Sequence, residues 1–366
     1  MANQKIIDKK KEEVKNLAEL MGNNREKTIF LEGLLASSIP LAFASIYGKC
    51  PPLLFILNDE EEAGYFYHDL SAIIGGDNVL FYPSAYRTNR KYAQRDSANE
   101  ILRTEVLARL SRGNDTDFIV TYPEALQERI VTRDKLQKNI LQLRAGEKTD
   151  IKSIEQILDS FNFQQEDYVY EPGQYALRGS IVDVFSYSCE YPYRIDFFGN
   201  NIDSIRTFDV QTQLSKETKD KIDIVPNLDY DDNEQEGERI LFLEALSKDT
   251  LIVSKNFKFV CESIDDDDFT AFAKKFRHIE IINANKIKKN ADKKSEIEFH
   301  TAYQPLFHKN FDLLKESFEE YLNDGYRIYI LADSAKQHQR LKDIFEEKSR
   351  FITFTPITKT VHEGFV

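Results

Sequence analysis

Short apolar runs alternate with amphipathic segments through the first third of the chain. The pattern predicts buried strands within residues 28–33, 52–58, 78–84 and 117–123. Between these runs, apolar residues recur at helical spacing, which predicts helices at residues 37–47, 60–74 and 96–112. Because parallel strands need a long connection between them, strands that alternate with helices predict a doubly wound parallel sheet.

The period of the pattern changes after residue 137. One helix is predicted at residues 150–161, and apolar and polar positions then alternate with a period of two. The alternation predicts strands within residues 167–171, 174–187, 191–199 and 201–210. Gly199, Asn200 and Asn201 are typical hairpin-turn residues. We therefore expect an antiparallel sheet backed by a helix.

A mixed α/β pattern returns from residue 213 to residue 294. Residues 249–256 and 278–283 are predicted to form buried strands, and the basic stretch 286–295 is predicted to be a linker. A further unit follows, with a helix at 311–323, a strand within 326–332 and a helix that ends near residue 347.

Composition restricts the class of protein. A chain of 366 residues is too long for one core, so roughly two to four domains are expected. Charged residues make up 30% of the chain, and no long apolar stretch or apolar signal core is present, which predicts a cytoplasmic protein without a membrane partner. The three Cys and six His are scattered, so neither a disulfide framework nor a metal site is expected.

The net charge of −13 argues against a chain that grips nucleic acid by itself, because such binding depends on Lys and Arg that neutralise phosphates. Residues 85–95 are a local exception, since they interleave Tyr86 and Tyr92 with four basic residues. This composition suits either a single-strand DNA contact or an ordinary charged surface loop.

Residues 30–48 have the outline of a phosphate-binding loop, because an apolar strand, a glycine and a short loop precede a helix. A working loop reads G-x-x-x-x-G-K-[ST]. Counting from Gly33 places Ser38 at the second glycine, Ile39 at the lysine and Pro40 at the hydroxyl position. Pro40 also lacks the N–H that a phosphate cradle needs. We interpret the segment as a degenerate nucleotide site without a cofactor.

The chain offers no convincing nucleophile. Ser37 and Ser38 have no base at a recognisable spacing, and neither a G-x-S-x-G motif nor a Cys-His arrangement occurs. We therefore predict no catalytic residue and no enzyme activity for this chain.

Residues 170–215, YEPGQYALRGSIVDVFSYSCEYPYRIDFFGNNIDSIRTFDVQTQLS, carry a dense and ordered pattern. It resembles the second domain of the bacterial transcription-repair coupling factors (Mfd), where E-P-G-x-[FY]-[AS]-x-R-G is followed by P-x-R-[IL]-[DE]-[LF]-F and I-[DE]-S-[IL]-R-x-F-D. The excision-repair protein UvrB carries a looser version of this block and is the alternative. UvrB keeps an intact phosphate-binding loop and a long DNA-clamping hairpin, and the segment before residue 96 looks too short for that hairpin.

The resemblance implies a multidomain α/β organisation. Residues 1–127 and 213–294 would form a degenerate, helicase-like (P-loop-type) parallel sheet domain, and residues 128–212 an inserted domain with an antiparallel sheet. Residues 295–366 would form a small α/β third domain. Ser254 and Lys255 stand where an active relative has its Mg²⁺-binding acidic pair.

The resemblance also implies a function. This chain would be the N-terminal, UvrB-mimicking part of a coupling factor, which recruits UvrA to stalled RNA polymerase. RNA polymerase and DNA would be bound by downstream domains that this chain lacks, and the ATP and Mg²⁺ of the family would act in its motor. A UvrB-type ATPase and a stand-alone nucleic-acid binder remain the alternatives.

The resemblance places the UvrA contacts at Arg178, Arg194 and Phe198 within residues 170–212. In a strand of period two, Arg194, Asp196 and Phe198 also share one side, which is expected to face solvent. An exposed aromatic ring beside an arginine is typical of a binding hot spot. The alternative is structural: Arg194 would pair with Asp183, and Phe198 would cover a neighbouring hairpin. A local pair of Arg206 with Asp209 is also expected.

Overall fold

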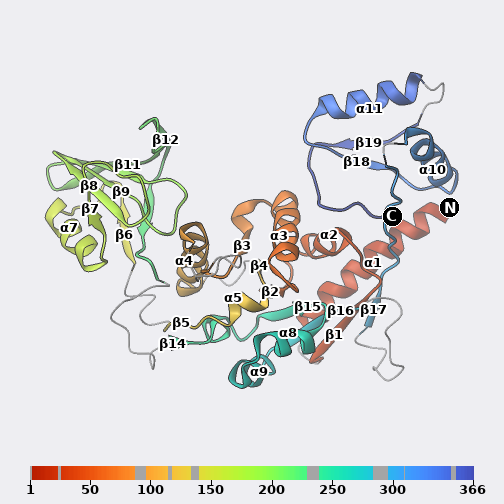
Figure 1. Cartoon of the computed structure of the whole chain (residues 1–366), viewed down its shortest axis with the longest axis horizontal. Coiled ribbons are helices and arrows are strands. Elements are labelled where there is room, and N and C mark those ends of the chain that lie inside the picture. The colour runs from red at the N-terminus through yellow and green to blue at the C-terminus, as the bar shows by residue number, and fades with distance from the viewer. Residues whose placement is uncertain are drawn as a thin grey trace.

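The computed structural model of the chain describes residues 2–23, 26–86, 96–113, 118–132, 140–228, 239–282, 296–308, 310–347 and 352–366. Figure 1 shows a parallel sheet with helices on both sides, an antiparallel sheet at one end of it, and a small α/β unit at the other. Both predicted sheet types are therefore present in this mixed α/β protein.

The parallel sheet has seven strands in the order β17-β1-β16-β15-β2-β4-β3. Its strands are β1 (Thr28–Glu32), β2 (Leu53–Ile56), β3 (Val79–Phe81), β4 (Phe118–Thr121), β15 (Leu251–Ser254), β16 (Arg277–Ile282) and β17 (Glu296–Glu298). Every neighbouring pair is parallel, as the alternation of strands and helices predicts. The pattern did not indicate β17, which is short and lies at the edge.

Helices cover the sheet because their apolar stripes meet its buried strands. They are α1 (Ala2–Gly22), α2 (Ser38–Ala44), α3 (Glu60–Ile74), α4 (Ser97–Ser111), α5 (Pro123–Leu126), α8 (Phe257–Ile264) and α9 (Asp267–Ala273), with short 3₁₀ turns η1 (Gly76–Asn78) and η3 (Phe242–Ala245). The α3 helix begins where the Asp59 carboxylate accepts a hydrogen bond from the Glu62 N–H at 2.9 Å. Phe43 from α2 and Phe55 from β2 pack edge to face at 4.9 Å in the core.

The antiparallel sheet has its own core. Its strand order is β12-β11-β10-β9-β8-β7, and α7 packs on one face. The elements of this part are β6 (Leu141–Arg144), α7 (Ile151–Ser160), β7 (Gln164–Gln165), β8 (Gln174–Arg178), β9 (Ile181–Val184), β10 (Tyr193–Phe198), β11 (Asn201–Phe208), β12 (Ser215–Thr218) and β13 (Lys221–Ile224). The core contains Ile154 and Leu158 of α7 against Val182 and Ile195 of the sheet. An antiparallel sheet backed by a helix is thus confirmed.

One predicted strand of this part is wrong. Residues 167–171 form no strand, because the Tyr170 and Glu171 N–H groups donate to Oε1 of Gln174 at 2.8 and 3.0 Å. A turn closed by a side chain replaces the expected ladder.

Short ladders join the parts of the chain. Strand β5 (Ile130–Val131) pairs antiparallel with β14 (Arg239–Ile240), on either side of the antiparallel sheet in sequence. Strands β12 and β13 follow residue 212 but pair with β11 and β6. The predicted domain boundaries stay predictions, and these pairings show that residues 215–224 pack with the antiparallel part.

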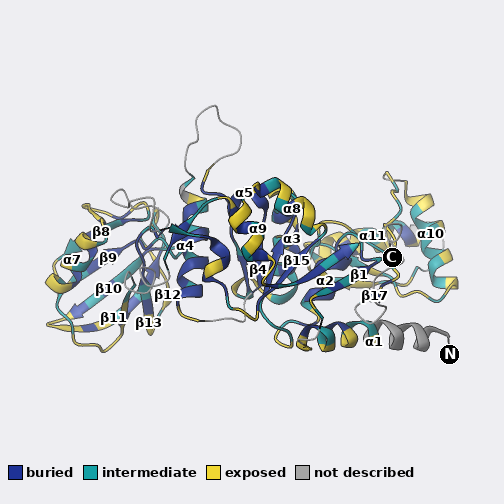
Figure 2. Cartoon of the chain, turned by 90° about the horizontal axis from the view of Figure 1, so that it is seen from below, coloured by how far each residue is buried: buried dark blue, intermediate teal, exposed yellow. Residues whose placement is uncertain are grey.

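The third unit consists of α10 (Phe311–Asn323), β18 (Tyr329–Leu331), α11 (Ala335–Glu347) and β19 (Thr355–Ile357), with β18 and β19 parallel. The helix predicted at residues 311–323 is confirmed. Figure 2 shows that buried positions concentrate in the two sheets, whereas α10 and α11 are mostly intermediate or exposed. Among the helices that the structure describes, none is long and apolar enough to cross a membrane.

Candidate functional site

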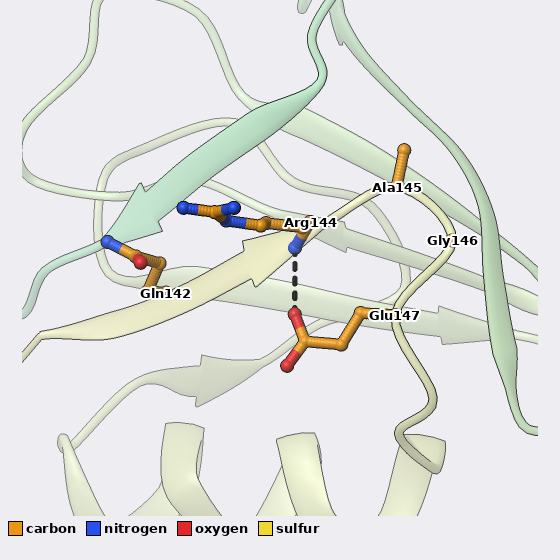
Figure 3. Close-up of a pocket in the computed structure, with 5 residues that line it drawn as sticks. All are labelled: Gln142, Arg144, Ala145, Gly146 and Glu147. Atoms are coloured by element: carbon orange, nitrogen blue, oxygen red, sulfur yellow. Dashed lines mark hydrogen bonds between the residues drawn. The ribbon is translucent and has the colours of Figure 1, made fainter.

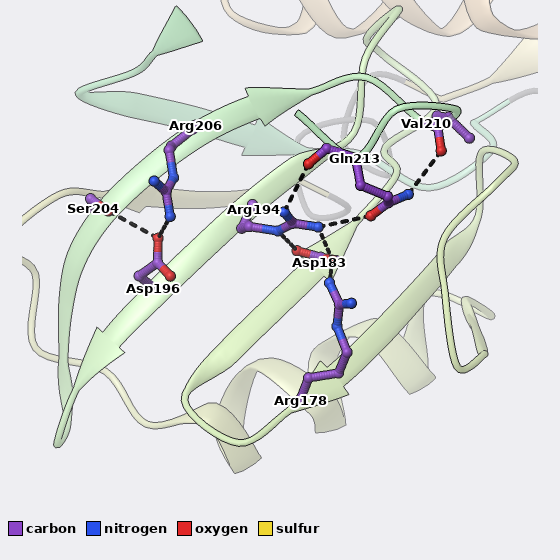
Figure 4. Close-up of polar contacts among 8 residues, drawn as sticks. All are labelled: Arg178, Asp183, Arg194, Asp196, Ser204, Arg206, Val210 and Gln213. Carbon is purple, nitrogen blue, oxygen red and sulfur yellow. Dashed lines mark hydrogen bonds and ion pairs between the residues drawn. The ribbon is translucent and has the colours of Figure 1, made fainter. Parts of the chain in front are cut away.

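The antiparallel sheet presents one buried and one polar face. Val182, Ile195 and Phe197 lie in the core against α7. Because side chains alternate along a strand, the opposite face receives Arg178, Asp183, Arg194, Asp196 and Arg206 (Figure 4). We call this the outer face, and it holds Arg178, Arg194 and Asp196, three of the four residues that the sequence assigned to partner binding.

Asp183 lies at the centre of the outer face. Nε of Arg194 is 2.8 Å from Oδ1 of Asp183, and Nη2 is 2.9 Å from Oδ2. This bidentate pair is well shielded, since the side chain of Asp183 is 1% exposed and that of Arg194 is 14% exposed. The guanidinium also lies 4.2 Å from the ring centroid of Phe208. Hydrogen bonding to Asp183 raises the pKa of Arg194 above its usual range.

Gln213 completes the environment of Arg194. Its backbone carbonyl and its Oε1 both accept from the guanidinium, at 3.3 and 3.0 Å. The left-handed backbone of Gln213, with φ 60°, lies in the turn before β12. Arg194 is therefore on the predicted side of β10 but is largely enclosed, and the structural pairing with Asp183 is the one observed.

Arg178 shares the same carboxylate. Its Nη2 forms an ion pair with Oδ2 of Asp183, and its side chain remains 34% exposed. The guanidinium lies 5.1 Å from the ring centroid of Tyr168, a residue that is 47% exposed. Within the described residues, Nε of Arg178 has no hydrogen-bond partner. One carboxylate thus orients two arginines, which leaves a net positive charge on the group. Arg178 is the more exposed of the two and presents this charge to solvent.

A second polar group lies farther along the sheet. Asp196 accepts from Nη2 of Arg206 at 2.6 Å and from Oγ of Ser204 at 3.0 Å. The expected pairing of Arg206 with Asp209 is wrong, because Asp209 caps the next turn through the Gln211 and Thr212 N–H groups. Arg206 lies on β11 opposite Arg194, so its side chain points to the same face as Asp196.

Phe198 ends β10 and is 80% exposed. Its ring does not cover a neighbouring hairpin, so the structural alternative for this residue is wrong. Arg178 and Arg194 converge on Asp183, whereas Phe198 extends beyond them at the Gly199 turn. The sequence analysis overlooked Tyr168 and Gln213. The aromatic Tyr168 stands ten residues before Arg178, and only the fold reveals that they meet.

The loop after β1 has the predicted position at the carboxyl end of a parallel strand. Its N–H groups are used within the protein: those of Gly33, Ser37 and Ser38 donate to backbone carbonyls, and that of Leu35 donates to the hydroxyls of Ser38 and Thr301. Ser38, Ile39 and Pro40 are all buried. Lys255 follows β15 and forms an ion pair with Glu62 of α3.

Other candidates give little. Residues 87–95 of the basic and aromatic segment lie outside the described residues. A surface pocket at the end of β6 is lined by residues such as Arg144 and Glu147 (Figure 3). The Arg144 N–H donates to the Glu147 carboxylate at 3.0 Å, and the Glu147 N–H donates to the Arg144 carbonyl at 3.1 Å. Nowhere in the described ranges do three His, Cys, Asp or Glu side chains gather as metal ligands would.

The segment that builds the outer face is similar to a known family of domains. Residues 141–230 match the family described as the UvrB interaction domain. These residues contain the whole outer face.

The curated relatives make the comparison more specific. The chain is 31% identical over 178 residues to the transcription-repair-coupling factor of Staphylococcus aureus (strain bovine RF122 / ET3-1), which is 49% of this chain and 15% of that protein. It is 28% identical over 215 residues to the transcription-repair-coupling factor of Myxococcus xanthus, which is 57% of this chain and 18% of that protein. The resemblance to transcription-repair coupling factors is confirmed, and the chain spans less than a fifth of their length.

Proposed function

We propose that this chain is the UvrB-mimicking module of a transcription-repair coupling factor, and that it recruits UvrA to stalled RNA polymerase in nucleotide excision repair. The family match supports this proposal because it covers the residues that build the outer face. UvrA would dock on that face. RNA polymerase, DNA and the ATP-driven motor are assigned to parts of a coupling factor outside this chain.

The exposure of Phe198 carries the proposal. A phenyl ring that is 80% exposed leaves most of its apolar surface available for burial by a partner. Its burial in a partner pocket would contribute about 1.5–3 kcal/mol. Arg178 would add a charged contact at low entropic cost, because Asp183 and Tyr168 already hold its guanidinium.

Arg194 and Asp196 would act mainly by positioning. Arg194 fixes Asp183, which in turn orients Arg178. Asp196 holds Arg206, whose side chain is 38% exposed and presents a second cation to the partner. The proposed surface is thus a set of oriented arginines beside one exposed ring.

We also propose that the chain binds no nucleotide. Four N–H groups of the loop, those of Gly33, Leu35, Ser37 and Ser38, donate to acceptors within the protein and not to a phosphate. Ile39 is 5% exposed in the hydrophobic core, so a lysine at this position would bury a charge. Lys255 presents a cation where Mg²⁺-binding carboxylates would be required.

A binding titration with purified UvrA tests the proposed function. Phe198→Ala should weaken binding by about 2 kcal/mol, or roughly thirtyfold, as expected for a hot-spot aromatic. Leu306→Ala is the matched control, since Leu306 is also 80% exposed but lies outside the outer face. Equal affinity of the Phe198→Ala variant and the unchanged chain would overturn the proposed docking surface.

Two further titrations address the competing functions. Saturable heat on addition of ATP and Mg²⁺ would favour an ATPase of the UvrB type. Salt-dependent affinity for single-stranded DNA would favour a nucleic-acid binder. Neither signal is expected at concentrations up to about a millimolar.

A further inference from the structure

The space beside the degenerate loop is occupied by the last residues of this chain. After β19, the chain returns to α2 and α3, and we call residues 361–366 the strap. Figure 1 shows that the C-terminal end lies at the level of α1 and α2, below α11. The strap pairs with residues 302–303, where Ala302 and Val366 exchange two backbone hydrogen bonds of 2.9 Å.

Asp69 of α3 binds the strap from a buried position. The carboxylate is 2% exposed, and a buried carboxylate is costly unless hydrogen bonds satisfy it. Its Oδ1 accepts from the His362 N–H at 2.7 Å, and its Oδ2 accepts from the Ser37 hydroxyl at 2.5 Å. Nδ1 of His68 lies 3.6 Å from Oδ1, but the side chain of His68 is 60% exposed. Asp69 therefore depends on a backbone group 293 residues away.

Ser37 extends this recognition by one residue. Its Oγ accepts from the Glu363 N–H at 3.0 Å, and its own N–H donates to the Glu363 carbonyl at 3.4 Å. Ser37 and Asp69 together bind two successive N–H groups and one carbonyl of the strap. These contacts recognise the backbone N–H and carbonyl groups of the strap, so they do not depend on its side chains.

Side chains at the beginning of the strap, and just before it, reinforce the contact with α3. The His362 ring stacks on Tyr65 of α3, with 3.5 Å between ring centroids and 13° between planes. Nζ of Lys359 donates to the Ile73 carbonyl at the end of α3 at 3.2 Å. Thr301 closes the loop from the other side, because its Oγ1 donates to the Gly33 carbonyl at 2.7 Å.

We propose that the degenerate nucleotide site is a peptide-binding site, formed by Ser37, Tyr65 and Asp69, whose occupant is the strap of this same chain. The site holds α10 and α11 close to the parallel sheet. The occupied site excludes a nucleotide for two reasons. The Asp69 carboxylate repels phosphate, and the Ser37 N–H already donates to the Glu363 carbonyl. The inference does not depend on UvrA, since no residue of the outer face takes part.

Hydrogen exchange of the full chain tests this site. The His362 and Glu363 amides should be protected, and Ser37→Ala should make the Glu363 amide exchange at least tenfold faster. Ser45→Ala is the matched control, because Ser45 directly follows α2 and, among the described residues, its hydroxyl donates to the Ala42 carbonyl of that helix and not to the strap. Protection of the buried Val120 amide reports whether the sheet itself stays folded.

A second variant changes the strap alone. Glu363→Pro removes the N–H that Ser37 accepts, at an exposed position that should not affect folding. Trypsin should then cleave after Lys359 at least fivefold faster than in the unchanged chain. Unprotected His362 and Glu363 amides in the unchanged chain would overturn the proposal. Unchanged exchange and cleavage in both variants would do the same.

Discussion

Arg194 and Asp183 form a bidentate ion pair across β10 and β9, in which the carboxylate is 1% exposed. Arg194→Glu places two carboxylates together in this enclosed position. We expect the free energy of unfolding to fall by about 3–5 kcal/mol, because a buried charge loses its partner. Urea denaturation measures the loss. Arg206→Glu, at a more exposed pair, should cost about 1 kcal/mol or less.

This expectation changes how binding data are interpreted. A variant of Arg194 that fails to bind UvrA would also be destabilised, so its affinity alone does not establish a contact. If Arg194→Glu unfolds at the same urea concentration as the unchanged chain, the enclosed pair contributes nothing and Arg194 is free to act as a direct contact.

Tyr168 provides a cleaner test of the outer face. Tyr168→Ala removes the ring beneath the Arg178 guanidinium and should lower UvrA affinity by about 1 kcal/mol. The melting temperature should stay nearly constant, because the side chain is 47% exposed. Tyr329→Ala serves as the control, since Tyr329 is 51% exposed in the third unit. Equal losses in both variants would point to a nonspecific effect.

Gly33 is required by a close backbone approach. It has φ +79°, and a Cβ added there would lie 1.9 Å from the Phe299 carbonyl oxygen. Gly33→Ala should therefore destabilise the chain by more than the roughly 1 kcal/mol that a left-handed backbone costs a residue with a Cβ. Gly48→Ala isolates that cost, because Gly48 has φ +73° and no described atom lies within 4 Å of its added Cβ. Equal melting temperatures of the two variants would contradict this assignment.

His278 makes stability depend on pH. Burial, together with the smaller effect of the Lys27 charge, lowers the pKa of His278 from 6.5 to about 4. Because the folded state disfavours the proton, stability is complete above pH 6.5 and is lost as the pH falls toward 4. The loss amounts to about 3 kcal/mol at full protonation. His278→Gln should remove this part of the acid sensitivity, whereas His300→Gln, at an exposed histidine, should leave it in place.

The sequence was most informative where periodicity is strong. The apolar runs of the parallel sheet were located to within a few residues, because strands buried on both faces read as continuous apolar stretches. Several short strands were missed, among them β12, which is exposed along its length, and β17, which has only three residues. The strand predicted at residues 167–171 was wrong because the same alternation of aromatic residues occurs there in a turn, which the Gln174 side chain closes.

In the candidate site, too, periodicity predicted some features and missed others. Period two placed Arg194 and Asp196 on the face where the structure has them, but it could not tell an enclosed arginine from an exposed one. Whether Arg194 is enclosed depends on Phe208 at the end of β11 and on Gln213 in the turn that follows, and both come later in the sequence. The partner of Asp69 lies 293 residues away, and no local pattern carries that information.

The β5 and β14 ladder brings together the two ends of the segment that contains the antiparallel sheet, since Val131 faces Arg239 and Ile130 faces Ile240. A segment whose entry and exit points are neighbours disturbs the rest of the fold little, because the flanking chain closes over almost the same gap with or without it. Mutations that reshape the surface of this segment are therefore largely decoupled from the parallel sheet. Such an arrangement allows the outer face and the parallel sheet to accumulate substitutions independently of each other.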